Sequence, residues 1–369
     1  MIRVLHLVGT LDPGGVETWL MSVLRKSDRA RVQMDFCTFA PGKGIFAAEA
    51  ESLGSKVYSC PMDQESRSLS RRFRAILREG KYDVVHSHVH YFSGAFLRWA
   101  NQEGVPRRIS HSHSTHDGKR SSIVRRGYRS AMRFLIRRHA TLCLAASQAA
   151  ARALYGQDWK SDARVLVLHY GIDLRPFSET VDSRAVRAEL GLPQGVPVIG
   201  HVGRFVEPKN HSFLVEIARE VIARRPDCQF LLVGDGQLRS AVEAQIGSYG
   251  LSKNVHVTGT RHDVPRIMLG AMDAFLLPSI WEGLGLVLIE AQAAGLPCVA
   301  SDRVPSEVVI LSERVTFASI TDGAEVWRDL LLGLLGRPTL QREGCIERVS
   351  RSDFAIERSV WGLENLYAS

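Results

Sequence analysis

Residues 277–301 read LPSIWEGLGLVLIEAQAAGLPCVAS, and this stretch decides the fold. The apolar run Ala274–Leu277 predicts a buried strand that ends at the following proline. Apolar residues at helical spacing then predict a helix over Leu286–Ala294, which a glycine and a proline end. Residues 297–301 (PCVAS) predict the next buried strand. A strand, Gly-rich turn, helix and strand in this order indicate a doubly wound α/β domain, which binds ligands at the carboxyl edge of its sheet.

Two carboxylates frame the turn of this unit. Glu282 lies in the loop and Glu290 in the second turn of the expected helix, with seven residues between them. The free backbone amides at the helix N-terminus favour a phosphate, and the two glycines allow close backbone approach. One carboxylate is expected to accept hydrogen bonds from a ribose diol and the other from sugar hydroxyls. The amides in question belong to Gly283, Leu284, Gly285 and Leu286.

This stretch resembles the E-x7-E signature of the retaining glycosyltransferases of family 4, which have the GT-B fold. Five further motifs match in family order along nearly the whole chain. They are GTLDPGGVE (9–17), HSHS (111–114), YGIDLRPF (170–177), GRFVEPKN (203–210) and VGDGQLR (233–239). Two glutamates in one helix are a weak signal, whereas six matches in order are a specific one. The motifs are most similar to the bacterial branch that builds exopolysaccharide, capsule or lipopolysaccharide.

The resemblance implies two Rossmann-like doubly wound domains that face each other across a cleft. We expect an acceptor-binding domain over 1–178, a nucleotide-sugar-binding domain over 179–352, and a C-terminal helix over 353–369 that crosses back to the first domain. Length agrees, since 369 residues exceed one typical core. Regular alternation of apolar strands and amphipathic helices after residue 195 also predicts a parallel sheet with helices on both faces.

Cations after the first strand of the second domain are the expected partners of a diphosphate. Arg204 and Lys209 follow that strand, and Gly203 and Gly234 lie at the ends of two strands. Arg offers a planar fork and Lys a point charge. Arg261 occupies the place where family members contact the nucleotide base. The alternative for Arg204 and Lys209 is a surface position without a ligand.

The first domain is expected to supply a histidine and a Gly-rich loop. Ile109, His111 and His113 alternate with serines, so both histidines should face the same way. Family members carry a histidine here that touches the donor sugar, and the strand end places His113 there, with His111 as the rival. The resemblance puts Gly14 and Gly15 beside the donor phosphates. The alternative for these glycines is a plain tight turn.

The charge of the chain is uneven. Residues 1–180 hold 28 Lys/Arg and 16 Asp/Glu, a net +12, and the remainder hold 19 and 23, a net −4. Eight Lys/Arg and no acidic residue lie in 119–138, which predicts a basic amphipathic helix for an anionic membrane surface. The alternative is a solvated helix docked on the sheet. Nucleic acid is not expected, because no binding motif accompanies the charge. We therefore expect a cytoplasmic enzyme at the inner face of the plasma membrane.

No metal or cofactor is expected at the reaction centre. The sequence lacks the D-x-D motif of metal-dependent transferases and the G-x-G-x-x-G motif of dinucleotide enzymes. Arg204, Lys209 and the helix N-terminus can stabilise a leaving diphosphate alone. The resemblance thus implies retaining transfer from a nucleotide-sugar, most often UDP-linked, to a lipid-linked glycan or nascent polysaccharide, with His113, Glu282, Arg204 and Lys209 as catalytic residues. Two alternatives are a nucleotide-sugar epimerase of the same fold and a non-catalytic scaffold.

Overall fold

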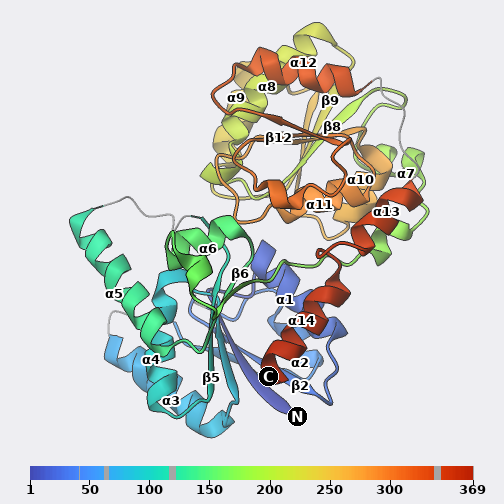
Figure 1. Cartoon of the computed structure of the whole chain (residues 1–369). Coiled ribbons are helices and arrows are strands. Elements are labelled where there is room, and N and C mark those ends of the chain that lie inside the picture. The colour runs from blue at the N-terminus through green and yellow to red at the C-terminus, as the bar shows by residue number, and fades with distance from the viewer. Residues whose placement is uncertain (41, 62–65, 116–121, 336–341, 369) are drawn as a thin grey trace. The chain divides into compact units, whose positions relative to one another are not determined.

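The computed structural model describes the chain except residues 41, 62–65, 116–121, 336–341 and 369. Contacts divide the chain into two compact units (Figure 1). The first comprises Met1–Gly171 and Ile356–Ser369, and the second comprises Ile172–Ala355. The sequence analysis placed the first boundary after residue 178, which is later than in the structure. It placed the second after residue 352, which is earlier than in the structure. Residues 172–178 belong to the second unit because the backbone of Ile172 pairs with Ala355 and hydrogen-bonds Phe354.

The first unit has a seven-stranded parallel sheet in the order β3-β2-β1-β4-β5-β6-β7. Helices cover both of its faces (Figure 1). The strands are β1 Ile2–Val8, β2 Val32–Thr38, β3 Val57–Ser59, β4 Val84–Ser87, β5 Arg107–Ser112, β6 Leu142–Ala145 and β7 Val165–Val167. The helices are α1 Gly15–Lys26, α2 Ala47–Ser52, α3 Ser66–Gly80, η1 His90–Phe92, α4 Ser93–Gln102, α5 Ile123–His139, α6 Gln148–Tyr155, η2 Trp159–Ser161 and α14 Ile356–Ala368.

The second unit has a six-stranded parallel sheet in the order β10-β9-β8-β11-β12-β13. The strands are β8 Val198–Val202, β9 Gln229–Val233, β10 Val255–Gly259, β11 Ala274–Leu277, β12 Cys298–Ser301 and β13 Val315–Ala318. The helices are η3 Arg175–Ser178, α7 Ser183–Glu189, η4 Glu207–Lys209, α8 His211–Arg224, α9 Arg239–Ser248, α10 Val264–Ala271, α11 Leu286–Ala293, η5 Ser306–Val308, α12 Ala324–Leu334 and α13 Arg342–Ser350.

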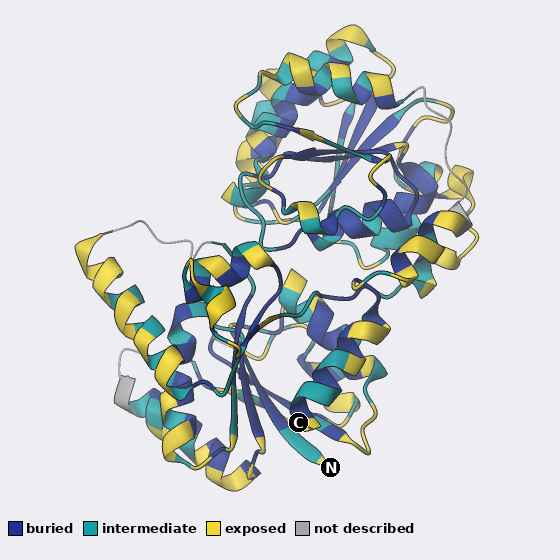
Figure 2. Ribbon diagram, in the orientation of Figure 1, coloured by how far each residue is buried: buried dark blue, intermediate teal, exposed yellow. Residues whose placement is uncertain are grey.

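The stretch that decides the fold forms the expected elements β11, α11 and β12. Every residue of β11 and β12 is buried, as continuous apolar runs require of a parallel sheet covered on both faces (Figure 2). Each sheet also contains a point where the strand order reverses. It lies between β1 and β4 in the first unit and between β8 and β11 in the second. Doubly wound sheets bind ligands at the carboxyl edge of such switch points.

The C-terminal helix α14 packs in the first unit, as expected. Glu364 accepts hydrogen bonds from the amide of Asp28, at 3.0 Å, and from Arg31, at 3.1 Å. The hydroxyl oxygen of Tyr367 lies 2.7 Å from Nδ1 of His86 in β4. The chain's last helix therefore completes the unit that its first strand begins. Among the described residues, no helix is long and apolar enough to cross a membrane.

Candidate active site

Two loops meet at the switch point of the second unit. The first follows β8 and contains η4, and the second follows β11. The side-chain amide of Asn210 donates to the carbonyl oxygen of Pro278, at 3.1 Å, and the amide of Ile280 donates to the carbonyl oxygen of Pro208, at 2.8 Å. These hydrogen bonds hold Lys209, from one loop, beside Glu282, from the other.

Lys209 and Glu282 form an ion pair at this point. The Lys209 ammonium lies 2.5 Å from Oε1 of Glu282, which also accepts a hydrogen bond from the Ser279 hydroxyl at 2.7 Å. The side chains are 19 % and 11 % exposed, so water screens the pair only partly. Both residues were candidates from the sequence, and the structure brings them together. An anionic ligand of Lys209 would have to compete with Glu282 or share the ammonium with it.

The glycines at the strand ends allow close backbone approach. A Cβ on Gly234, whose φ is +144°, would lie 2.1 Å from the carbonyl oxygen of Gly203. A Cβ on Gly203 would lie 3.2 Å from the Lys209 side chain. No side chain larger than hydrogen therefore fits at Gly234 unless the backbone shifts, and Gly203 lies directly beside the cation.

The N-terminus of α11 is shaped by a left-handed glycine. Gly285 is the N-cap residue, with a φ of +92°, a conformation that favours glycine. Leu284 before it is buried, and Leu286 after it begins the helix, while Gly283 is half-buried. The first amides of α11 thus follow the loop that carries Glu282. The two are close, because a Cβ on Gly285 would lie 3.8 Å from Cγ of Glu282.

Glu290 lies one turn into α11 and is half-buried. Burial raises the pKa of its carboxyl group from 4.5 to about 7, and the charge of Lys209 opposes this rise. Among the described residues, none donates a hydrogen bond to this carboxyl group. It is therefore a half-buried acceptor without a protein partner, as expected of a group that binds ligand hydroxyls.

The two arginine candidates differ in their surroundings. Arg204 follows β8 with an exposed side chain, and no contact of the described residues ties its guanidinium to Lys209 or Glu282. Arg261 is held by Asp263, at 2.8 Å, and Glu189, at 2.6 Å. Hydrogen bonds to these two carboxylates raise the pKa of Arg261. Its charge is compensated, so it could offer a ligand a flat face rather than a free cation.

The remaining candidates lie in the first unit. Gly14 is the N-cap of α1 and Gly15 its first residue, and nothing lies within 4 Å of a Cβ on Gly15. His111, in β5, is fully buried, whereas His113, just beyond the strand, lines a cavity of about 310 Å³. The two rings do face the same way, with centroids 4.1 Å apart. The structure places His113 at the end of β5, as the alternation predicts.

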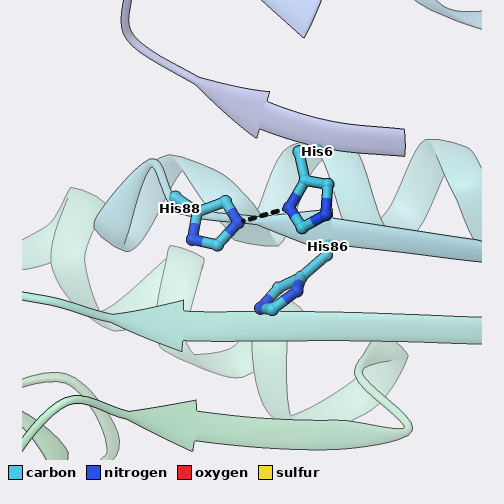
Figure 3. Close-up of side chains that lie close together, drawn as sticks. All are labelled: His6, His86 and His88. Atoms are coloured by element: carbon cyan, nitrogen blue, oxygen red, sulfur yellow. Dashed lines mark hydrogen bonds between the residues drawn. The ribbon is translucent and has the colours of Figure 1, made fainter. Parts of the chain in front are cut away.

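Sequence reasoning missed the size of the histidine cluster around these rings. His6 in β1 and His86 and His88 at the end of β4 join His111 and His113 across three neighbouring strands. Nδ1 of His6 lies 3.0 Å from Nε2 of His88 (Figure 3), and Nδ1 of His88 lies 2.7 Å from Nε2 of His113. Burial lowers the pKa of His6 to about 3. No local pattern signals this cluster, because His6 joins it only through the adjacency of β1 and β4 in the sheet.

Two Rossmann-like units, with a last helix that returns to the first, define the architecture of a GT-B glycosyltransferase. Family profiles agree with this class. "Glycosyl transferase 4-like domain" matches residues 14–171, and "Glycosyl transferases group 1" matches residues 182–342. The chain is also 34 % identical to EpsF of Bacillus subtilis (strain 168), named as a glycosyltransferase, over 99 % of this chain and 96 % of that protein. The chain belongs to this family of glycosyltransferases, as the motifs predicted.

Other relatives and solved structures extend the comparison. The chain is 25 % identical to the capsular polysaccharide biosynthesis glycosyltransferase CapH of Staphylococcus aureus, over 79 % of each chain. It is 29 % identical to the UDP-Gal:alpha-D-GlcNAc-diphosphoundecaprenol alpha-1,3-galactosyltransferase of Escherichia coli, over 62 % and 59 %. HepE of Anabaena in complex with UDP-glucose has the same fold, with a TM-score of 0.81 at 21 % identity over the whole of both chains. EpsF, CapH and the Escherichia coli relative are all named as transferases, which disfavours the epimerase and scaffold alternatives.

Proposed function

We propose that the chain transfers a sugar, with retention of anomeric configuration and without a metal, from a UDP-sugar to a lipid-linked glycan or nascent polysaccharide. The observation that carries this proposal is the Lys209–Glu282 pair at the switch point of the second unit. A cation, a carboxylate, a helix N-terminus and two glycines with little room for a side chain occur there together. A nucleotide-sugar needs each of these contacts, for its phosphates and its hydroxyls.

The donor would bind through charge and through backbone amides. Its diphosphate accepts from Lys209 and from the first amides of α11, and Arg204, with its exposed side chain, can turn toward it. The carboxyl groups of Glu282 and Glu290 accept from donor hydroxyls. Arg261 lies under the base, where its flat guanidinium stacks while Glu189 and Asp263 hold it.

The reaction breaks the bond between the anomeric carbon and the diphosphate oxygen. That oxygen keeps the electron pair, an acceptor hydroxyl oxygen forms the new bond on the same face, and the hydroxyl proton passes to the departing diphosphate. Lys209 and the α11 amides stabilise the negative charge that develops on the leaving group. Glu282 and Glu290 are assigned to hydroxyls, so neither is a nucleophile. We propose His113 as the residue of the first unit that faces the sugar.

The acceptor side of the proposal has two supports. The Escherichia coli relative is named for a diphosphoundecaprenol acceptor, and CapH for capsular polysaccharide. Helix α5 also presents apolar and basic side chains to solvent. Ile123, Val124 and Phe134 are 79 %, 83 % and 65 % exposed, and Arg126 and Arg138 are exposed beside them. We propose that this face of α5 attaches the enzyme to an anionic membrane surface. Residues 119–121 of the basic segment lie outside the described part of the chain.

One experiment tests the donor site directly. Calorimetry of the full chain in excess chelator should show binding of UDP and of at least one UDP-sugar, and weaker binding of GDP. Lys209→Met should weaken UDP binding at least tenfold, whereas Lys253→Met, at an exposed lysine of the same unit, should leave it unchanged. Equal binding by both variants, or binding only with an added divalent ion, would refute the proposed site.

A further inference from the structure

The histidine cluster of the first unit has a composition and a position that the donor site does not explain. His88, His111 and His113 each offer one ring nitrogen, and the three nitrogens lie within 4.8 Å of one another. They stand at the carboxyl ends of β4 and β5, beside the switch point between β1 and β4. Ligands bind at such points. Three converging imidazoles in this place need an account of their own.

The hydrogen bonds of the cluster leave three buried ring nitrogens without a partner, namely Nε2 of His6, Nε2 of His111 and Nδ1 of His113. Nδ1 of His111 lies 3.1 Å from Nε2 of His86, and Nδ1 of His86 lies 2.7 Å from the Tyr367 hydroxyl oxygen. Nε2 of His111 has no hydrogen-bond partner, although the residue is fully buried. Buried polar atoms are rarely left in this state. The ring of His111 lies close to two further imidazoles, with centroids 4.1 Å from that of His113 and 5.5 Å from that of His88, and these are suitable surroundings for a metal ligand.

We propose that His88, His111 and His113 bind a transition-metal cation of the Zn²⁺ class, through Nδ1 of His88 and Nε2 of the other two rings. Imidazole nitrogens suit Zn²⁺, Co²⁺ and Ni²⁺, and the ligand set contains no carboxylate that would favour Mg²⁺ or Ca²⁺. Three protein ligands and one open position are the usual arrangement of a tetrahedral site that keeps an exchangeable ligand.

A metal ion binds a ring nitrogen that carries no proton, so a suitable tautomer of each ring must be available. His111 can donate from Nδ1 to His86, and His88 can donate from Nε2 to His6, which frees the ligand nitrogens. Nδ1 of His88 and Nε2 of His113 lie 2.7 Å apart. Tetrahedral ligation needs about 3.3 Å, so the rings must separate slightly.

The second shell and the access route fit this trio better than the neighbouring one. His6, His86 and His88 also lie close together (Figure 3), but both nitrogens of His86 have partners outside that trio, Tyr367 and His111. In the chosen trio, the partner of Nδ1 of His88 is another proposed ligand, His113. In the chosen trio, His86 instead orients a ligand, as outer partners of ligating histidines do. His88 and His113 line the cavity of about 310 Å³, which gives an ion a way in and leaves room for a fourth ligand. Arg125 lines the same cavity and favours an anion in that position.

The three ligands all lie in the first unit, and an ion bound to them would regulate the enzyme. Lys209 and Glu282 lie in the second unit, so the ion does not replace them as partners of the diphosphate. A bound ion would instead hold the imidazole of His113, the ring that the proposed function assigns to the sugar. This consequence rests on the proposed function, whereas the binding of the ion does not. Binding is therefore tested without an activity assay.

Cobalt titration of the full chain, stripped of metal by dialysis against chelator, tests the proposal. We expect one Co²⁺ per chain, with the visible absorption bands of tetrahedral coordination, and displacement by Zn²⁺. His113→Gln should abolish the tetrahedral bands and weaken binding at least a hundredfold. His6→Gln, which removes an outer partner, should weaken it about ten- to a hundredfold and keep the bands. His262→Gln, at an exposed histidine of the second unit, is the matched control and should change nothing.

Several results would overturn the proposal. Absence of stoichiometric binding would do so, as would tetrahedral bands that persist in His113→Gln or disappear in His262→Gln. Loss of the bands in His6→Gln with their retention in His113→Gln would assign the ion to the other trio. If His113→Gln does not fold, X-ray absorption of wild-type protein loaded with Zn²⁺ decides. Three imidazole ligands support the site, and a sulfur shell refutes it. UDP binding in chelator is unaffected by any of these outcomes, so failure here is distinguishable from failure of the donor site.

Discussion

Replacing Glu290 by Gln gives the sharpest test of the electrostatics of the donor site. Burial raises the pKa of Glu290 from 4.5 to about 7. Between pH 4.5 and about pH 7, Glu290 loses its proton in the unfolded chain and keeps it in the folded chain. The free energy of unfolding therefore falls as the pH rises through this range. A shift of this size costs about 3 kcal/mol above pH 7, because a tenfold change in proton affinity is 1.36 kcal/mol. The amide of Gln does not titrate and removes this cost.

The assay compares the two proteins across pH. Urea unfolding gives the free energy of unfolding of each protein, and the value for the variant minus that for the wild type is the quantity compared. This difference should rise by about 3 kcal/mol between pH 4.5 and pH 8. Glu243→Gln, at an exposed glutamate of the same unit, should show no such rise. In the wild type alone, affinity for a UDP-sugar should also strengthen as pH rises through 7, because the carboxylate is the better acceptor of hydroxyl hydrogen bonds. A flat difference across pH would refute the half-buried, unpartnered environment assigned to Glu290.

Three further predictions address catalysis, backbone shape and membrane binding. Lys209→Met should lower kcat for sugar transfer by about 100- to 1000-fold, as loss of one stabilising donor does, and a kcat within threefold of wild type would contradict its role. Gly234→Ala should lower the free energy of unfolding by about 1–3 kcal/mol, because the new Cβ would lie 2.1 Å from a carbonyl oxygen. Gly247→Ala is the control and should be neutral or stabilising, because nothing lies within 4 Å of a Cβ at that position. Phe134→Ser should weaken flotation with anionic vesicles about tenfold. Trp361→Ser, which changes an exposed aromatic residue on α14, should leave flotation unchanged. Equal loss in both variants would contradict the proposed role of α5.

Local patterns were enough to predict the elements that hold the site. The strand, helix and strand of 274–301 follow from apolar periodicity and from the stop signals, and the structure has them as β11, α11 and β12. The return of α14 to the first unit came from the family resemblance, since nothing local says where a helix packs. The boundary near residue 172 was missed because it depends on Ile172 pairing with Ala355, far along the chain.

Long-range contacts explain what the sequence could not supply. Lys209 and Glu282 were both singled out, but as partners of a ligand, and their pairing with each other depends on backbone bonds between two loops. The histidine cluster has the same origin. Alternation put His111 and His113 on one face, whereas His6 joins them only because β1 and β4 are adjacent at the switch point. Periodicity gives the face of a strand and not its neighbour.

Salt should separate the two kinds of electrostatic attraction that we propose for this chain. The net charge is +12 over residues 1–180 and −4 over the rest. The proposed site of the anionic nucleotide therefore lies in the part of the chain whose net charge is negative. We expect the Lys209–Glu282 pair, and not the net charge, to decide donor binding. At 0.15 M salt the interactions of exposed charges are screened beyond about 8 Å, whereas Lys209 is only 19 % exposed and is screened less. The proposed attachment of α5 to vesicles would instead depend on exposed cations such as Arg126 and Arg138. Raising salt from 0.05 to about 0.5 M should therefore abolish flotation with anionic vesicles while UDP affinity changes by less than about tenfold. Parallel loss of both would show that long-range charge, and not the ion pair of the switch point, holds the donor.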